Sequence, residues 1–512
     1  MRGPAVPGSP ELWAGTAGGR RGRRSDRRSY RLATAATGYP PTMASNLIGG
    51  HWQSPTGDRT IDRDDPVDGR PSHTFTVSSA ADVEAAVAAA AAAARGWAET
   101  PAGERGAALR RWSDRLRAAR TELAEAQARV LGIEPPEAVG ATEAAADGVA
   151  QFAELGQVHR GRSLAGGPGA LDAMVHSPRG ATAVIVPWND PIPLVTQAVA
   201  ANLAVGNTVV VKPSERATPP ALRALELLHD CDLPDGVLNV LVGDREVGRW
   251  LVEHPGVGTV LHTGSVRTGR EIAALCAERG AKAILELGGK DALVVDADVD
   301  PEWAAQQAAL GAFANSGQIC TAVERIYTVG DVHEPFVDAL ADLATKRGAL
   351  PLVDTVQRDV VHGHVADALA RGAEALCGGE VPDRPGAWYP ATVLVGVDDD
   401  MAVMRDETFG PVAPVLRVDG FDEALGRAAA SPYGLAATVL SGRQDHALRA
   451  AERLPVGTVK INAVFGGAPG GSAEPHGASG MGVGYGPELL DELCRWRVVH
   501  WSAPVLRGNE RR

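Results

Sequence analysis

Aromatic residues are scarce in this chain: 7 Phe, 10 Trp and 6 Tyr make up 4% of its 512 residues. So few aromatic side chains argue against a long aromatic-lined groove for a polymer. Cysteine is scarcer still, with five residues, an odd number without paired spacing. This usage indicates a reduced, cytoplasmic chain in which any special cysteine acts as a single thiol.

Long apolar runs are also missing. The best candidate for a membrane span, residues 191–211, is interrupted by two prolines, one glycine and three amide side chains, so we expect no transmembrane segment. The formal net charge is −13, which disfavours a general nucleic-acid partner because such a surface repels phosphate polymers. No metal site is predicted: His362 and His364 lack a carboxylate or thiol at a suitable spacing and are expected on a helix surface.

Residues 1–42 differ from the rest of the chain. They hold eight Arg against two acidic residues, a net charge of +6, and show no hydrophobic periodicity. Three explanations compete: a disordered basic arm, a transit-like peptide, or a start assigned too early. The sequence from Met43 reads like the beginning of a folded enzyme, which favours the third explanation.

From residue 80 onward, helical and strand-like segments alternate. Helical periodicity occupies residues 80–98 and 103–130, with Ser79 as a candidate N-cap and Pro101 between them. The further segments are apolar strands at 182–186, 208–211, 237–242, 259–261, 293–295, 325–329 and 438–440, and helices near 191–205, 218–230 and 245–253. This alternation predicts a two-lobed α/β enzyme with parallel sheets covered by helices.

Two segments carry candidate catalytic groups. Cys320 lies in a small, polar context, and a thiol there becomes a nucleophile where local dipoles favour the thiolate. The other four cysteines are expected to be small buried residues. Glu286 ends an apolar strand before Gly288 and Gly289, where partial burial would raise its pKa toward that of a general base. The alternative for Glu286 is a strand-end carboxylate paired with Lys290.

Three further strand ends carry candidate binding groups. The amide of Asn189 could donate to a developing oxyanion, or belong to a turn between two prolines. Lys212 and Glu215 could hold ribose hydroxyls, or form a solvated loop. Gly264 and Ser265 open a helix whose first amides could bind a phosphate, or form an ordinary cap; no G-x-G-x-x-G or Walker A sequence follows a strand.

In their order along the chain, these segments resemble the NAD(P)-dependent aldehyde dehydrogenase superfamily. The resemblance covers about residues 46–503 and includes Glu407-Thr408-Phe409-Gly410-Pro411 near its end. Its most specific blocks are Leu285-Glu286-Leu287-Gly288-Gly289-Lys290 and Gly317-Gln318-Ile319-Cys320.

The resemblance implies a fold and a domain organisation. The expected fold is α/β, with a Rossmann-like cofactor domain at residues 46–156 and 180–288 and an α/β catalytic domain at 289–487. A small β segment at 157–179 and 488–503 would serve oligomerisation, giving a homodimer or homotetramer.

The resemblance also implies the chemistry. Cys320 would add to an aldehyde, Asn189 would stabilise the oxyanion, and Glu286 would activate the water that hydrolyses a thioester to the carboxylic acid. The residues expected to bind the cofactor are Trp188, Lys212, Ser214, Glu215, Gly264, Ser265, Glu407 and Phe409. NAD is preferred over NADP as the cofactor, because the Glu215 carboxylate would repel a 2′-phosphate.

Two alternative functions follow from the same resemblance. A CoA-acylating semialdehyde dehydrogenase is disfavoured because that branch usually lacks the glutamate found here at Glu286. A non-catalytic binding relative is disfavoured because Cys320, Asn189 and Glu286 are all present. No Arg or Lys of the matched motifs is placed to bind a second carboxylate, which argues slightly against succinate semialdehyde as the substrate.

Three departures from the family pattern concern the substrate and cofactor sites. Asp190 follows Asn189 where an aromatic or aliphatic residue is common, and His262 replaces the usual Phe before Thr263. The block from Glu474 to Gly482 lacks the common lysine. The surrounding glycine-rich residues 466–486 are expected to form a loop near the substrate.

Overall fold

The structure, a computed structural model, describes residues 45–167, 169–467 and 470–502. The extension predicted for residues 1–42 lies outside the described residues, as does residue 503. Helices and strands alternate along the chain, which confirms the predicted α/β class. In the described part of the chain, no helix combines the length and the apolar character needed to cross a membrane.

One sheet of the described residues has eight strands, and its central strands β9, β8, β7, β10 and β11 are parallel. Its order is β2 (His51–Gln53), β1 (Asn46–Ile48), β9 (Leu238–Val240), β8 (Thr208–Lys212), β7 (Ala181–Ile185), β10 (Thr259–Thr263), β11 (Lys282–Glu286) and β23 (Gly480–Met481). Strands β7 and β8 are fully buried apolar runs, as expected for a sheet covered on both faces. Because these strands are parallel, their carboxyl ends meet at one edge.

Helices cover both faces of this sheet. One face packs against α2 (Ala102–Ala118), α4 (Pro135–Val158), α5 (Pro191–Val205) and α6 (Thr218–His229). The other packs against α1 (Ala80–Glu99), α7 (Arg245–Glu253) and α8 (Val266–Arg279). Helix α1 begins at the predicted cap, where Ser79 and Asp82 form a capping box.

The single helix predicted over residues 103–130 is wrong. The chain forms α2 and then α3 (Arg120–Leu131), separated at Ala119. Ala119 has φ −91° and ψ 9°, outside the helical range, and neither Pro nor Gly marks this break in the sequence.

The second sheet is built the same way. Its order is β15 (Glu374–Cys377), β17 (Thr392–Val395), β18 (Val412–Val418), β13 (Val323–Val329), β12 (Asp291–Val295), β20 (Ala436–Leu440) and β21 (Thr458–Ile461), and only β15 is antiparallel to its neighbour among these described strands. Helices α9 (Pro301–Phe313) and α10 (His333–Arg347) cover one face. Helices α11 (Thr355–Ala370), α13 (Phe421–Ala429) and α14 (Gln444–Arg453) cover the other.

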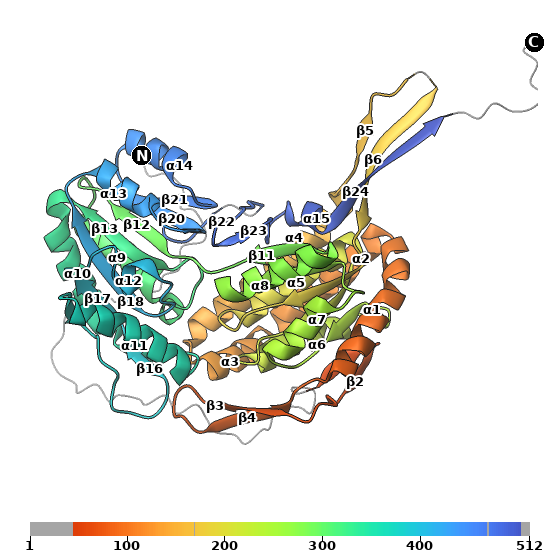
Figure 1. Ribbon diagram of the computed structural model, residues 1–512, viewed down its shortest axis with the longest axis horizontal. Helices are drawn as coiled ribbons and strands as arrows, with labels where there is room; N and C mark the ends of the chain where they lie inside the picture. Colours follow the sequence, from red (N-terminus) through yellow and green to blue (C-terminus); the bar gives the residue numbers. More distant parts are fainter. Residues whose placement is uncertain (1–44, 168, 468–469, 503–512) are drawn as a thin grey trace, which may run out of the picture. The chain divides into compact units, whose positions relative to one another are not determined.

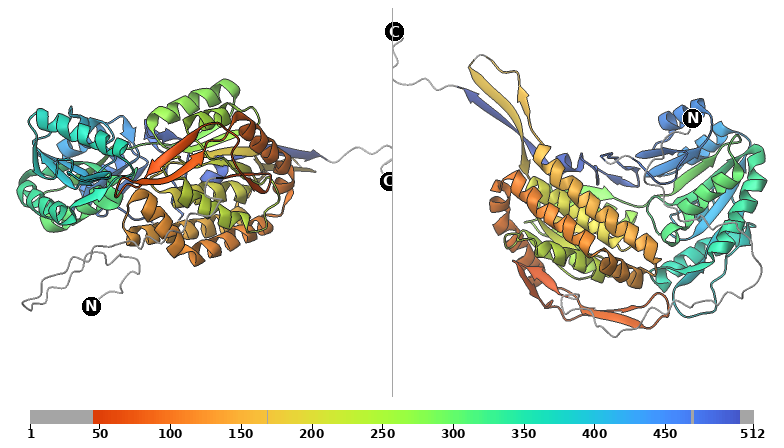
Figure 2. Two further views of the ribbon diagram at one scale, coloured as in Figure 1. Left: turned by 90° about the horizontal axis from the view of Figure 1, so that it is seen from below. Right: turned by 180° about the vertical axis from the view of Figure 1, so that it is seen from behind.

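Three antiparallel strands form an arm that extends away from the helices of the first sheet (Figures 1 and 2). They are β5 (Arg162–Leu164), β6 (Ala170–Pro178) and β24 (Cys494–Ser502), with β6 in the middle. Apolar side chains of the arm are exposed: Leu171 to 65%, Val498 to 64% and Trp501 to 66%.

Short elements complete the described chain. They are β3 (Thr60–Asp64), β4 (Pro71–Thr76), β14 (Ala349–Pro351), β16 (Trp388–Pro390), β19 (Tyr433–Gly434), β22 (His476–Gly477), α12 (Ala402–Arg405), α15 (Leu489–Glu492) and the 3-10 turns η2 (Ala314–Gly317) and η3 (Gly330–Val332). Residues 466–486 are therefore not all loop, because β22 and β23 lie within them. Strand β23 pairs with β11, which places Gly480 opposite Glu286.

Candidate active site

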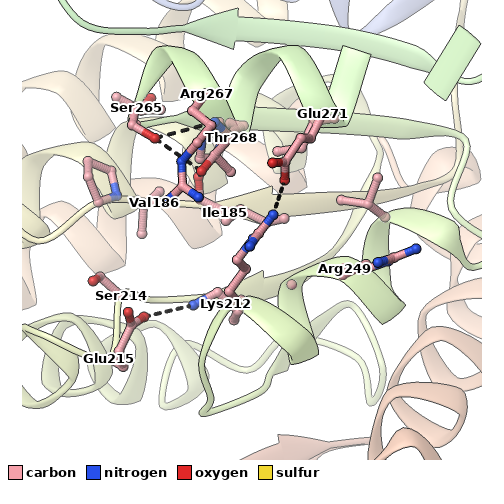
Figure 3. Close-up of a pocket in the computed structure, with 18 of the residues that line it drawn as sticks. Ile185, Val186, Lys212, Ser214, Glu215, Arg249, Ser265, Arg267, Thr268 and Glu271 are labelled. Atoms are coloured by element: carbon pink, nitrogen blue, oxygen red, sulfur yellow. Dashed lines mark hydrogen bonds and ion pairs between the residues drawn. The ribbon is translucent and has the colours of Figure 1, made fainter. Parts of the chain in front are cut away.

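A cavity of about 720 Å³ opens where three parallel strands of the first sheet end side by side. Strand β7 ends at Ile185, β8 at Lys212 and β10 at Thr263, and all three residues line the cavity. Six of the predicted cofactor-binding residues line it as well: Trp188, Lys212, Ser214, Glu215, Gly264 and Ser265. Figure 3 shows Ser265 and Thr268 on one side of the cavity and Lys212 and Glu215 on the other.

Lys212 is held rigidly at this edge. Its side chain is buried, and its ammonium donates to the backbone oxygens of Pro213 and Gly243, both at 2.9 Å. The same Nζ lies 3.6 Å from a carboxylate oxygen of Glu215, whose side chain is 34% exposed. These contacts exclude the solvated-loop alternative and leave the pair facing the cavity, where it can bind ligand hydroxyls.

Helix α8 begins at the cavity wall. Ser265 is its N-cap, and the Ser265 hydroxyl accepts a hydrogen bond from the backbone N–H of Thr268 at 3.3 Å. The first turn contains no acidic residue, and Arg267 also lines the cavity. The positive end of the helix dipole and the Arg267 guanidinium therefore both favour an anionic group here.

His262 adds an acceptor to the same wall. Its Nδ1 lies 3.1 Å from the carbonyl oxygen of Ile185, and since a carbonyl only accepts, Nδ1 carries the proton. Nε2 is then an acceptor, and it is buried without a hydrogen-bond partner. Burial lowers the pKa of His262 to about 4, so the ring is neutral at pH 7.

Gly264 leaves room for that ring. A side chain at residue 264 would meet two ring atoms of His262 at 2.7 Å. Polar groups that can hold hydroxyls, a helix start suited to phosphate and an unpartnered acceptor therefore share one cavity. These residues fit a dinucleotide cofactor.

Glu286 lies at the end of the neighbouring strand, β11. One of its carboxylate oxygens accepts a hydrogen bond from the backbone N–H of Gly484 at 3.0 Å. Burial raises the pKa of Glu286 to about 7, so the carboxylate can take up a proton near neutral pH. The alternative pairing with Lys290 is excluded, because the Lys290 ammonium bonds to Glu324 and Thr408 instead.

The segment before Cys320 has an unusual backbone. Asn315, Ser316 and Gly317 have φ of 47°, 54° and 71°, a left-handed run that two non-glycine residues adopt at a cost. Side chains hold it in place: the Ser316 hydroxyl donates to the Pro351 carbonyl at 3.2 Å, and Gln318 Oε1 accepts from the backbone N–H of Val353 at 3.0 Å.

Cys320 follows this segment and is partly exposed. Cys231, Cys276 and Cys494 are buried as expected, but Cys377 is also partly exposed, so the prediction was wrong for that residue. Burial raises the pKa of the Cys320 thiol to about 12, and the nearby charges of Asp291 and Glu286 raise it further. The thiol is therefore neutral at pH 7 and needs a base to become a nucleophile.

Asn189 is tied to the same segment. Its Nδ2 donates to the carbonyl oxygen of Gln318 at 3.0 Å, and the Asn315 side chain donates to the backbone oxygen of Asn189 at 2.9 Å. Asn189 is buried, and its amide carries a second N–H. That N–H can donate to an oxygen that develops negative charge beside the thiol.

The structure adds two residues that the motifs did not identify, Asp291 and Lys460. A side chain at Gly289 would meet both the Cys320 carbonyl oxygen, at 2.6 Å, and Asp291 Oδ1, at 2.9 Å, so these atoms are neighbours. Asp291 Oδ2 is buried without a hydrogen-bond partner. The positive charge of Lys460 lowers the thiol pKa and the Asp291 pKa. Lys460 lies outside the matched motifs. The one feature of the sequence that could have drawn attention to it is that the chain has only five lysines.

Glu407 and Phe409 are positioned by a buried ion pair. The Lys290 ammonium donates to Glu324 Oε2 at 2.7 Å, and the two Glu324 oxygens accept the backbone N–H groups of Thr408 and Phe409 at 2.8 Å. Phe409, which has φ 52°, then meets the Trp188 ring edge-on at 5.4 Å. Glu407 accepts from the backbone N–H of Gly289 at 3.1 Å.

Removing one partner of this ion pair is expected to destabilise the protein. Lys290→Met should lower the free energy of unfolding by about 3–5 kcal/mol, because the Glu324 carboxylate would stay buried without its cation. Guanidinium unfolding measures the loss. Lys346→Met, the same change at an exposed lysine, should shift the free energy by less than about 0.5 kcal/mol. Equal effects of the two substitutions would contradict the structural role of the pair.

Comparison with protein families identifies a match across most of the chain. The model of the aldehyde dehydrogenase family matches residues 52–499. This range contains the cavity, Glu286, Asn189 and Cys320.

Individual proteins agree with that match. The chain is 35% identical over 439 residues to a benzaldehyde dehydrogenase [NAD(+)] of Pseudomonas putida, covering 82% of this chain and 88% of that one. It is 36% identical over 410 residues to a succinate-semialdehyde dehydrogenase [NADP(+)] of Deinococcus radiodurans, covering 78% and 85%. A betaine aldehyde dehydrogenase variant of Staphylococcus aureus, solved with NAD+, is 28% identical, with a TM-score of 0.87 and coverage of 92% and 99%.

Proposed function

The chain belongs to the aldehyde dehydrogenase family, and we propose that it oxidises an aldehyde to the carboxylic acid through a covalent adduct on Cys320, with NAD as the cofactor. One observation carries the assignment of the roles. The strained loop that leads to the partly exposed Cys320 thiol holds the buried Asn189 amide through the Gln318 carbonyl, and the charge of Glu286, whose pKa of about 7 suits a general base, acts on that thiol.

The first half of the reaction uses Cys320 and Asn189. The sulfur bonds to the carbonyl carbon of the aldehyde, and the thiol proton leaves to a base as the carbonyl oxygen gains negative charge. The Asn189 amide and the backbone N–H of Cys320 donate to that oxygen and stabilise the thiohemiacetal. The bound cofactor supplies a hydride acceptor, and loss of hydride from the adduct leaves a thioester on Cys320.

The second half of the reaction uses Glu286. Its carboxylate takes a proton from a water molecule as the water attacks the thioester carbonyl, and the carboxylic acid leaves as the Cys320 sulfur departs. The backbone N–H of Gly484 holds one carboxylate oxygen, which leaves the other oxygen to take the proton. This general base supports hydrolysis over the CoA-acylating alternative. The presence of both Glu286 and the Cys320 thiol also argues against the alternative that this chain is a non-catalytic binding protein.

The cofactor would lie in the cavity at the ends of β7, β8 and β10. Lys212 and Glu215 would hold the adenosine ribose, Ser265 and the start of α8 the pyrophosphate, and Glu407 the nicotinamide ribose. Trp188, Ser214, Gly264 and Phe409 would complete the contacts. The relatives named above use NAD(+) in one case and NADP(+) in another, and the Glu215 carboxylate favours NAD in this chain.

Glu215→Gln is expected to shift the cofactor preference toward NADP. The neutral amide no longer repels a 2′-phosphate, and the four arginines that line the cavity, Arg216, Arg245, Arg249 and Arg267, attract it. The ratio of kcat/KM for NADP to that for NAD should rise by about tenfold, which corresponds to about 1.4 kcal/mol. Steady-state kinetics with both cofactors measures it, with Glu278→Gln, an exposed change on α8 outside the cavity lining, as the control. An unchanged ratio would remove Glu215 from cofactor selection.

We also propose that the chain forms a homodimer or homotetramer in the cytoplasm. The arm supports association, because β24 is an exposed edge strand and Leu171, Val498 and Trp501 expose apolar surface along it. All five cysteines are free, which suits a reducing compartment.

The proposed function is tested by NADH formation across a panel of aliphatic, aromatic, amino and carboxylated aldehydes, with NAD or NADP and without CoA. Carboxylated aldehydes belong in the panel because Lys460, which lies outside the matched motifs, places a positive charge near the thiol. Turnover of at least one class without CoA is expected. A folded, NAD-binding protein that turns over aldehyde only when CoA is added would contradict the hydrolytic reaction.

A further inference from the structure

An ammonium group that the reaction described above does not use lies near the catalytic thiol. It belongs to Lys460, which lies on β21, and the charges of Lys460 and Cys320 act on each other. We propose that Lys460 binds a carboxylate at the far end of the substrate, so that the chain oxidises carboxylated aldehydes. This assignment rests on the proposed function and names its substrate class.

The register of the second sheet places Lys460 on the face that carries the thiol. Lys460 pairs with Thr438 of β20, and Thr438 pairs with Leu293 of β12. Paired residues of neighbouring strands point to the same face of a sheet, and Leu293 belongs to the core that α9 covers. The chain leaves α9 through η2 and then reaches Cys320. The Lys460 side chain and the thiol therefore lie on the same side of the sheet.

A series of contacts also joins the general base to β21. The backbone N–H of Gly484 donates to Glu286, and the next residue along the chain is Tyr485. The Tyr485 hydroxyl lies 3.4 Å from the Thr458 hydroxyl, and Thr458 stands two residues before Lys460 on the same face of the strand. Tyr485 is 39% exposed and Lys460 is partly exposed, so a ligand can reach both.

The Lys460 ammonium is free to bind a ligand. Among the described residues it has no hydrogen-bond or ion-pair partner. Its contact is with the Phe465 ring, whose centroid lies 5.5 Å from Nζ. The buried Lys290, by contrast, donates to Glu324 at 2.7 Å. An ammonium with three N–H groups and no protein acceptor is suited to a carboxylate, because such charge-assisted hydrogen bonds are short and strong.

Asp291 does not occupy that ammonium. Besides the thiol, it is the one charged group of the described residues that acts on Lys460, and the two side chains form no ion pair within 4.0 Å. Asp291 Oδ1 accepts the backbone N–H of Ala436 at 3.1 Å instead. Burial raises the pKa of Asp291, which reduces its negative charge near neutral pH. A bound carboxylate would favour the charged form of Lys460, whose pKa burial lowers.

The arrangement selects the charge of the substrate. The aldehyde carbon would lie at Cys320 and the carboxylate at Lys460, with the Thr458 and Tyr485 hydroxyls as further donors. Oxidation would then release a dicarboxylate. An aldehyde that ends in an ammonium group would be repelled by Lys460, and one that ends in a methyl group would leave the ammonium without an acceptor.

The ratio of kcat/KM for a carboxylated aldehyde to that for an uncharged aldehyde of equal length tests the proposal. Aldehydes of about four to six carbons are compared in the full-length protein with NAD and without CoA. The ratio should be at least about tenfold in the native protein and should fall by at least about tenfold in Lys460→Met. Lys346→Met, the same change at an exposed lysine, should keep the native ratio. A native ratio near one, or a ratio that Lys460→Met leaves unchanged, would overturn the proposal.

A second measurement needs no turnover, so it separates this proposal from the oxidation itself. Glutarate, a dicarboxylate like the expected products, should slow the alkylation of Cys320 by iodoacetamide, measured by mass spectrometry of the Cys320 peptide. The glutarate concentration that halves the rate should rise by at least about tenfold in Lys460→Met and stay the same in Lys346→Met. Absent protection, or equal protection of Lys460→Met, would overturn the proposal. Protection that depends on Lys460 in a protein that oxidises no aldehyde would support the anion site and contradict the proposed function alone.

Discussion

Cys320→Ala is expected to abolish aldehyde-dependent NADH formation, with kcat/KM reduced by at least about 10³-fold. The reason is that no covalent adduct can form without the sulfur. Binding of NAD should be nearly unchanged, because Cys320 does not line the cofactor cavity. Steady-state kinetics and a separate NAD titration measure the two effects.

Cys377→Ala is the matched control. Cys377 is also a partly exposed thiol, but it lies on the edge strand β15, where it makes a weak contact with the Ala391 carbonyl at 3.8 Å. This variant should keep nearly full activity. Substantial turnover by Cys320→Ala, or an equal loss in both variants, would contradict the assignment of the nucleophile.

Glu286→Gln is expected to separate the two halves of the reaction. The amide oxygen can still accept the Gly484 N–H, but an amide cannot take a proton from water. NADH should form in a burst of about one per active site and then slowly, with kcat lower by about 10²- to 10⁴-fold. Rapid-mixing absorbance measures the burst, and Glu452→Gln, an exposed change on α14, is the control. If no burst is seen and NADH forms slowly from the start, Glu286 would have to act in the first half-reaction.

The pH dependence follows from the same residue. Glu286 is active as the carboxylate, so kcat of the native enzyme should fall about tenfold per pH unit below its pKa of about 7. In Glu286→Gln the slow phase should lose this dependence. A native profile that stays flat from pH 8 to pH 5.5 would show that another group serves as the base.

Local patterns were sufficient to predict much of the fold. Buried runs of Val, Ile and Ala gave β7 and β8, and the predicted strand over residues 237–242 is present but shorter, as β9. The break at Ala119 was missed because no helix-breaking residue marks it. Only the backbone dihedral angles of Ala119 separate α2 from α3. Strand β23 was missed because two residues carry no periodicity, and its pairing with β11 is a long-range contact.

The candidate site was predictable where motifs carry the chemistry and not where partners are distant. Lys290 stands four residues from Glu286, yet its partner is Glu324, because burial selects the carboxylate that can also hold two backbone N–H groups. Sequence spacing does not encode this arrangement.

The central claim, a covalent intermediate on Cys320, is tested most directly by trapping it. Glu286→Gln is mixed with NAD and an aldehyde that the enzyme turns over, quenched with acid during the burst, and digested for mass spectrometry. We expect the peptide that carries Cys320 to gain the mass of the acyl group, in step with the NADH formed. NADH formation with an unmodified Cys320 peptide, or with the acyl group on another cysteine, would contradict it.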